Sequence, residues 1–258
     1  MLQSWINKIL RNIIFHYHFF KNAGTSVDAL LKSNFPEQWV TREFTGGNHA
    51  INVSQVEDWI RQEPNAIAFS SHTAALPPPE LKGIKILPVL FVRHPIDRIA
   101  SAYSFERKQG GDSFGAVLAR NTTLQGYIEV RLSLKHDRQC RNFHVSRLSQ
   151  MFKGEDSDEI ALALRALEVL PFVGIVDKFD QSMEEMAKWL SSYFLDFHAT
   201  PMARNVTRDL SIPLNQRLDQ IKTEIGEDCY TKLLEANAGD IAVYNASFQK
   251  RVVSDNCD

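Results

Sequence analysis

The chain has 258 residues, of which 44% are hydrophobic and 23% are charged, and its formal net charge is -2. This length and composition allow a sizeable core and fall within the range of one large α/β domain, so we expect residues 1–258 to form a single domain. The net charge excludes a global attraction to nucleic acid or anionic membranes, and any anion site must be built locally. Three cysteines, Cys140, Cys229 and Cys257, are too few and too scattered for a disulfide framework or a zinc site.

The N-terminal segment argues against a membrane anchor. Residues 1–14 are too short and too interrupted by Asn, Lys and Arg to span a bilayer, and no small-residue cleavage site follows them. We therefore expect a soluble, unsecreted chain without a transmembrane segment.

The stretch 15–27, FHYHFFKNAGTSV, predicts a strand, a loop and the start of a helix. A loop of this kind directs backbone N–H groups at one point, and the helix behind it adds its positive dipole end. Lys21 adds a full positive charge, so the loop predicts a phosphate or sulfate site. The nucleotide-triphosphate signature GxxxxGK[ST] is absent, because the lysine precedes Gly24.

The next segments predict a helix and a short strand. Residues 53–61 have helical spacing, with Ser54 as the expected N-cap and Glu57 three residues later, as in a capping box. Residues 66–69 form a short apolar run that continues into polar residues, so His72 is expected just beyond the end of a strand.

Residues 84–92 are the most apolar run in the chain and predict a buried parallel strand. Arg93 follows it, and Pro95 suits the first turn of the next helix. A guanidinium at the strand end and the hydroxyl of Ser101, two turns into that helix, can hold one phosphate from two sides.

The rest of the chain carries fewer signals. Residues 34–48 predict strand or loop, and residues 110–154 are polar and irregular, with several arginines that either face solvent or border a pocket for an anionic substrate. Regular elements are expected at 157–170 (helix), 172–176 (strand), 179–194 (helix) and 213–248 (helices).

Several of these segments together resemble the sulfotransferases. KNAGTS at 21–26, with His18 ahead of it, is similar to their 5′-phosphosulfate loop, and RHPIDRIASAY from Arg93 is similar to their 3′-phosphate motif. VGIV at 173–176 and DIAVYNASF at 240–248 resemble further blocks of the carbohydrate branch, which includes heparan sulfate 2-O-sulfotransferases and bacterial sulfotransferase family 2 proteins. The chain departs from the pattern where Phe19 and Phe20 replace the usual Ile-Pro, and where Asp177 and Lys178 stand near a usual Glu.

The resemblance implies a three-layer α/β fold of the P-loop NTPase type, with a central parallel sheet. It implies that 3′-phosphoadenosine 5′-phosphosulfate is the co-substrate and that no metal is required. The residues expected to bind this donor are Lys21, Asn22, Ala23, Gly24, Thr25, Ser26, Arg93 and Ser101. The branch has a histidine after a short strand, a position that His72 matches, and His49 is the reserve candidate.

A neutral imidazole can accept a hydroxyl proton near neutral pH, which suits a general base. His72 and Lys21 are therefore the expected catalytic residues. His16 and His18 alternate on one strand face, but no third ligand pattern accompanies them, so a packed strand is favoured over a metal site.

The expected function is sulfuryl transfer to a hydroxyl of a glycan or glycolipid, with no nucleic-acid partner. A nucleotide or metabolite kinase on the same fold and a non-catalytic nucleotide-binding module are the alternatives. The resemblance leaves two locations open, a bacterial-type cytoplasmic enzyme or the soluble part of a trimmed Golgi-type enzyme. The oligomeric state is not predicted.

Overall fold

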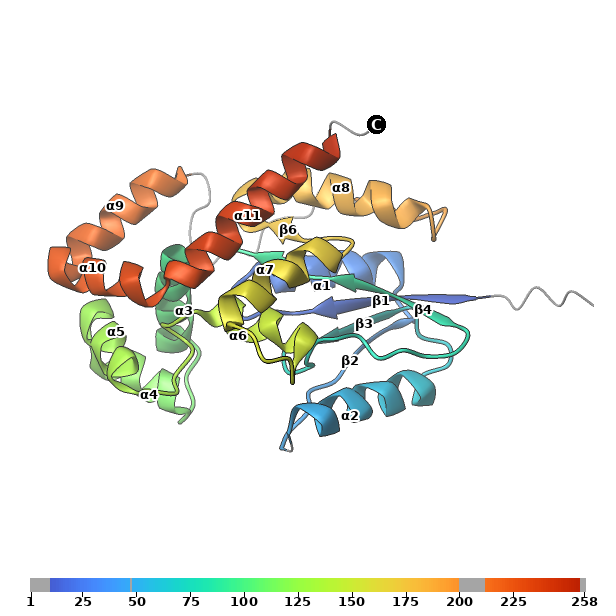
Figure 1. The fold of residues 1–258 in the computed structure, drawn as a ribbon, viewed down its shortest axis with the longest axis horizontal. Coiled ribbons are helices and arrows are strands. Elements are labelled where there is room, and N and C mark those ends of the chain that lie inside the picture. The colour runs from blue at the N-terminus through green and yellow to red at the C-terminus, as the bar shows by residue number, and fades with distance from the viewer. Residues whose placement is uncertain (1–9, 47, 200–211, 256–258) are drawn as a thin grey trace, which may run out of the picture.

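The computed structural model describes residues 10–46, 48–199 and 212–255. Strands and helices alternate through the first part of the chain, and helices dominate the second (Figure 1). In chain order the elements are β1 (Arg11–Tyr17), α1 (Gly24–Asn34), β2 (Trp39–Thr41), α2 (His49–Gln62), β3 (Ala68–Ser71), β4 (Ile84–Val89), β5 (Phe91–Val92), α3 (Pro95–Lys108), α4 (Phe114–Asn121), α5 (Leu124–Ser133), α6 (Phe143–Leu148), the 3₁₀ helix η1 (Ser149–Phe152), α7 (Glu159–Val169), β6 (Gly174–Ile175), the 3₁₀ helix η2 (Val176–Lys178), α8 (Phe179–Ser191), α9 (Leu214–Ile225), α10 (Glu227–Ala236) and α11 (Ala238–Asp255).

A parallel sheet with the strand order β2-β3-β1-β4 forms the centre of the fold. In its register, Phe15 of β1 lies between Phe69 of β3 and Pro88 of β4. β5 pairs in parallel with β6 in a separate two-stranded sheet. The apolar run 84–92, expected as one strand, is thus divided between two sheets at Leu90. The predicted mixed α/β class with a central parallel sheet is confirmed.

Helices cover both faces of the larger sheet. Ile13, Phe15 and Tyr17 pack on one face in a core shared with α2, α6, α7 and α11. Ile14 packs on the other face, in a core shared with α1 and α8. Because side chains alternate along a strand, His16 of β1 faces the same side as Ile14, toward α1.

The stretch 110–154 was expected to be irregular, and this prediction is wrong. It contains α4, α5, α6 and η1. Ser113 and Thr123 cap α4 and α5, since each hydroxyl accepts a hydrogen bond from a backbone N–H in the first turn. These helices are short and depend on tertiary burial, which local sequence patterns do not reveal. α4 and α5 share a core with α3, α9 and α10, whereas α6 packs in the core that contains α7 and α11.

The expected capping box at Ser54 is also wrong, because α2 begins earlier, at His49. Asn48 is the N-cap, and its Oδ1 accepts a hydrogen bond from the N–H of Ile51 at 3.1 Å. Glu57 lies inside the helix and pairs with Arg61 at 2.7 Å instead. The strand expected at 66–69, the helices at 157–170 and 179–194, and the strand at 172–176 correspond to β3, α7, α8 and β6, and 213–248 contains α9, α10 and most of α11.

The predictions for the N-terminal segment and for the three cysteines fall partly on residues that the structure does not describe. Residues 1–9 and Cys257 lie outside the described ranges, whereas Cys140 and Cys229 are free and buried. Within the described part of the chain, none of the helices combines the length and apolar character that crossing a membrane requires.

Candidate functional site

The loop between β1 and α1 has an uncommon backbone. Lys21 and Ala23 have φ angles of 63° and 61°, in the left-handed region that residues with a side chain rarely occupy. Ala23 is the N-cap of α1 and contributes no side-chain cap. The loop thus turns sharply twice, and the first turn of α1, which contains Gly24, Thr25 and Ser26, directs its N–H groups and positive dipole end toward the bend. This geometry is typical of an anion site.

Gly24 is required for space. A Cβ on this residue would lie 2.0 Å from Cδ2 of His18, closer than any real contact. The ring of His18 is itself held in place, because its Nδ1–H donates to Oδ2 of Asp28 at 2.8 Å. The imidazole of His18 therefore packs directly against the start of α1, and only glycine fits there.

Lys21 and Arg93 bring the two predicted anion-binding motifs into contact. Arg93 follows β5, and its Nη1 donates a hydrogen bond to the carbonyl oxygen of Lys21 at 3.3 Å. The ammonium of Lys21 lies 4.5 Å from the ring centroid of Phe105. Burial and, second, the charge of Arg93 lower the pKa of Lys21 to about 8. Two cations this close favour an anionic ligand that carries more than one charge.

A buried ion network holds Arg93. Its Nε donates to Oδ2 of Asp97 at 2.6 Å, and Arg217 of α9 contacts both Asp97 and Asp177. Burial opposes the charge of Asp97, but Arg93 and Arg217 outweigh it and hold the pKa of that carboxyl below its ordinary value.

One nitrogen of this network is unsatisfied. Nη2 of Arg93 is buried and has no hydrogen-bond partner among the described residues. Leaving a buried charged donor unpaired is costly, so the atom is ready to bind an acceptor such as a phosphate oxygen. Ser101 is also buried and lies one turn beyond Asp97 on α3.

His72 lies just beyond β3 and forms a pair with Glu43. Its Nδ1–H donates to Oε1 of Glu43 at 2.7 Å, and its backbone N–H donates to the same carboxylate at 3.0 and 3.2 Å. The hydroxyl of Thr73 donates to Oε2 of Glu43 at 2.8 Å. Burial raises the pKa of Glu43, but the hydrogen bonds from His72 and Thr73 outweigh it, and the pKa is lowered. The two side chains of the pair are 48% and 43% exposed, so a solute can reach them.

His72 is also close to the anion-binding loop. Its ring stacks on that of His18, with a centroid separation of 3.8 Å. This proximity follows from the sheet, in which Tyr17 of β1 pairs with Ser71 of β3, so both strands end at the same edge. His49, the reserve candidate, lies in the first turn of α2, and its Nε2 contacts the carbonyl oxygen of Leu76 at 2.5 Å.

Three buried side chains, linked by hydrogen bonds, anchor the loop. The sequence alone did not predict this network. Oδ1 of Asn22 accepts from Nε2 of His144 at 2.9 Å, and Nδ1 of His144 lies 3.0 Å from Oδ2 of Asp240. Asp240 also accepts from the backbone N–H groups of His144 and Val145. The three side chains come from the loop, α6 and α11, and all are at most 1% exposed. Only the resemblance of 240–248 to a family block pointed to this region.

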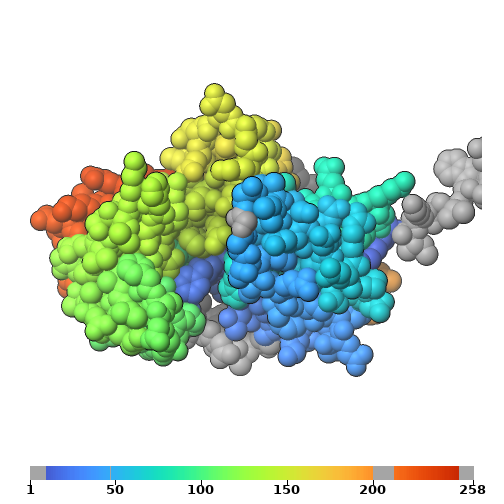
Figure 2. All heavy atoms as spheres, turned by 90° about the horizontal axis from the view of Figure 1, so that it is seen from below, coloured from blue at the N-terminus to red at the C-terminus, as the bar shows by residue number. Residues whose placement is uncertain are grey.

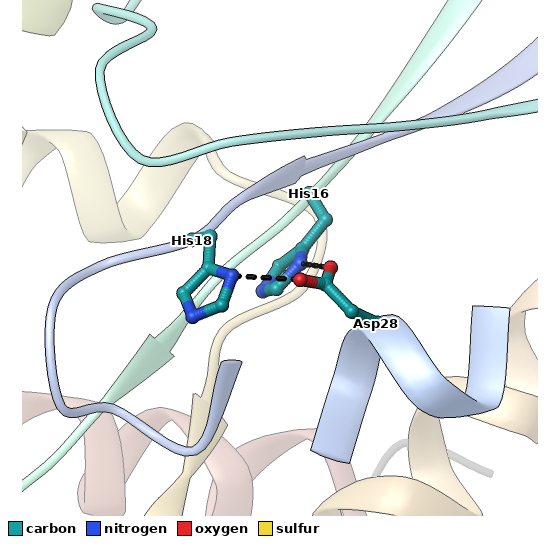
Figure 3. A group of neighbouring side chains, drawn as sticks. All are labelled: His16, His18 and Asp28. Atoms are coloured by element: carbon teal, nitrogen blue, oxygen red, sulfur yellow. Dashed lines mark hydrogen bonds and ion pairs between the residues drawn. The ribbon is translucent and has the colours of Figure 1, made fainter. Parts of the chain in front are cut away.

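The side of β1 that faces α1 carries a second histidine beside His18. Asp28 accepts from Nδ1 of His16 at 2.7 Å through one oxygen and from Nδ1 of His18 at 2.8 Å through the other (Figure 3). The hydroxyl of Ser70 donates to Asp28 at 2.5 Å. Burial raises the pKa of Asp28, but the two histidines outweigh it and hold the pKa well below its ordinary value.

The surface of the described chain has an open cleft (Figure 2). Figure 2 shows it between the green surface of α4 and α5 and the blue-to-cyan surface around α2. Deep-blue atoms from the start of the described chain lie on its floor. The cleft thus exposes atoms from the early part of the described chain.

Comparison with known proteins places the chain in a family. The sequence matches no family model. It is 45% identical over 241 residues to an uncharacterized protein from Archaeoglobus fulgidus, a match that covers 91% of this chain and 95% of that protein. The chain therefore belongs to the same family as this archaeal protein.

Proposed function

We propose that this protein is a sulfotransferase that moves a sulfuryl group from 3′-phosphoadenosine 5′-phosphosulfate to a hydroxyl, on the P-loop-like version of the three-layer fold. The observation that carries the proposal is the contact between Arg93 and Lys21, which joins the two motifs into one basic site. Nη2 of Arg93, which is buried and has no partner in the part of the chain that the structure describes, supports it, because a 3′-phosphate oxygen would satisfy that nitrogen.

The donor's two phosphate groups have different partners in this scheme. The 5′-phosphosulfate binds the loop Lys21, Asn22, Ala23, Gly24, Thr25 and Ser26, where Lys21 and the N–H groups at the start of α1 lie together. The 3′-phosphate binds Arg93 and Ser101. Asn22 contributes by fixing the loop through His144, since its side chain is buried and occupied with that contact.

The chemistry is an in-line displacement in which His72 takes the acceptor proton. Because Nδ1–H of His72 donates to Glu43, the neutral ring has its lone pair on Nε2, which receives the proton. The acceptor oxygen forms a bond to sulfur as the bond from sulfur to the bridging oxygen breaks. The electron pair stays on the leaving phosphate, where Lys21 and the loop N–H groups stabilise the developing charge.

A polar hollow beside Glu43 supports a carbohydrate acceptor. It has a volume of about 310 Å³, and its lining includes Gln55, Asp58 and Gln62 of α2 as well as Glu43. Amide and carboxylate groups of this kind can pair with sugar hydroxyls. Glu43 lines the hollow and is also the hydrogen-bond partner of His72. A glycan or glycolipid bound in the hollow would therefore lie next to His72.

The deciding experiment measures both binding and transfer. Calorimetric titration should give tighter binding of adenosine 3′,5′-bisphosphate than of ATP with Mg²⁺, and radiolabelled sulfate should pass from the donor to members of a glycan library. Preference for ATP would establish the kinase alternative. Tight bisphosphate binding without transfer to any acceptor would leave a non-catalytic binding module.

A further inference from the structure

His16, His18 and Asp28 form a compact cluster that sulfuryl transfer does not use. Each residue offers one ligand atom, and these atoms all lie within 4.8 Å of one another. The histidines come from one side of β1 and its extension, and Asp28 lies in the second turn of α1 (Figure 3). The sequence shows the two histidines at alternate positions, but only the packing of α1 on the sheet supplies the third group.

The cluster is held before any ligand arrives. The side chains of His16 and His18 are 1% and 9% exposed, and that of Asp28 is 20% exposed. The hydroxyl of Ser70 donates to one oxygen of Asp28, and the ring of His18 packs closely against Gly24. Such hydrogen bonds to a ligand carboxylate tune metal affinity in known sites.

We propose that His16, His18 and Asp28 bind one divalent transition-metal ion of the zinc type. Metal–ligand distances of about 2.0–2.2 Å in a tetrahedral site place neighbouring ligand atoms ~3.3 Å apart. The Nδ1 to carboxylate separations here are 2.7 and 2.8 Å, so small side-chain shifts admit the ion. The ion replaces the Nδ1 protons, which move to Nε2 or to solvent.

The ligand types select the metal. Two imidazoles and one carboxylate suit zinc, cobalt, nickel or copper, whereas Mg²⁺ and Ca²⁺ prefer oxygen ligands alone. Three protein ligands leave a coordination position open, and Asp28 is exposed enough for water to reach it. The ring of His18 stacks on His72, so the ion would lie one ring away from the residue proposed as the base.

Metal binding is tested on untagged full-length protein, independently of sulfuryl transfer. After a chelator has removed bound metal, the protein is incubated with Zn²⁺ and dialysed, and wild type should then retain one Zn²⁺ per chain by elemental analysis. Co²⁺ in its place should give visible absorption bands typical of low-symmetry coordination, and Mg²⁺ should neither bind nor compete. Asp28→Asn, which keeps the size of the side chain, should weaken Zn²⁺ binding at least tenfold.

Two further variants make the result decisive. His136→Asn removes an exposed histidine outside the cluster and should bind Zn²⁺ as wild type does. Ser70→Ala keeps all three ligands and should weaken binding about tenfold, which tests the cluster even if Asp28→Asn fails to fold. Absence of stoichiometric Zn²⁺ in wild type, or equal affinity of Asp28→Asn, Ser70→Ala and His136→Asn, would overturn the proposal. Neither result bears on sulfotransferase activity.

Discussion

The guanidinium of Arg93 donates from Nη1 to the carbonyl oxygen of Lys21 at 3.3 Å, although the two residues are 72 positions apart in the chain. The contact joins the loop after β1 to the turn after β5. It exists because both turns lie where strands end and helices begin, the usual place of ligand sites in parallel α/β sheets.

Arg93→Ala should weaken binding of adenosine 3′,5′-bisphosphate by more than tenfold. The lost charge-assisted hydrogen bond is worth on the order of 1.5–3 kcal/mol. Adenosine 5′-phosphosulfate lacks the 3′-phosphate and should bind nearly as well to the variant as to wild type. Calorimetric titration of both ligands provides the measurement, and an equal loss for the two would contradict the assignment of Arg93.

Binding of the bisphosphate should weaken as the pH rises through about 8, the pKa to which burial and Arg93 lower Lys21. Below this pH the protonated amine attracts the anion, and above it the free protein loses that charge. Lys21→Arg keeps the charge at all these pH values and serves as the control. Titrations across the range should show a decline for wild type and a flat profile for Lys21→Arg. A decline of the same size in both proteins would exclude Lys21 as its source.

His72→Asn should lower kcat by about 10²–10⁴, the usual contribution of a positioned base, and leave the Kd of the donor nearly unchanged. Glu43→Gln should also lower kcat, because the amide stabilises the protonated ring of His72 less and can hold its wrong tautomer. His49→Asn, which removes the reserve candidate, is the matched control for steady-state assays. Nearly full turnover in His72→Asn would contradict the assignment, and His49 or a carboxylate such as Glu43 or Glu106 would then be tested as the base.

Gly24→Ala should destabilise the protein by about 1–3 kcal/mol, as overpacking does. The new methyl group would lie 2.0 Å from His18, whose ring cannot retreat while Asp28 holds it. Urea unfolding measures the loss. Gly126→Ala, where the nearest atom is 3.3 Å away, is the control and should change stability little. Similar values for both variants would show that the contact with His18 relaxes easily.

Asp240→Ala should lower the free energy of unfolding by about 3–5 kcal/mol, because it leaves His144 and two backbone N–H groups buried without an acceptor. Asp158→Ala removes an exposed helix cap on α7 and should cost only about 1 kcal/mol. Denaturant unfolding compares the two. If Asp240→Ala cost no more than Asp158→Ala, the anchoring of Asn22 through His144 would be unimportant for stability.

Local patterns predicted much of the sheet and several helices. The apolar runs around Phe15, Phe69 and Val89 became β1, β3 and β4, since strand burial on both faces requires such runs. The same reasoning failed for α4 and α5, whose apolar residues pack against α3, α9 and α10, and for α6, whose apolar residues pack against α7 and α11. It also misplaced the start of α2, because Asn48 competes with Ser54 as a cap and local sequence does not rank them.

For the candidate site, the sequence by itself determined the chemistry near each turn. A lysine, a glycine and two hydroxyls after one strand, an arginine after another and a histidine after a third are properties of short segments. Only the tertiary structure decided which of these groups meet and what orients them. The contacts of Lys21 with Arg93, of His72 with Glu43 and of Asn22 with His144 depend on strand order and helix packing. Such contacts join distant parts of the chain, and no local periodicity encodes them, because they form only when burial of both faces of the sheet fixes where each helix lies.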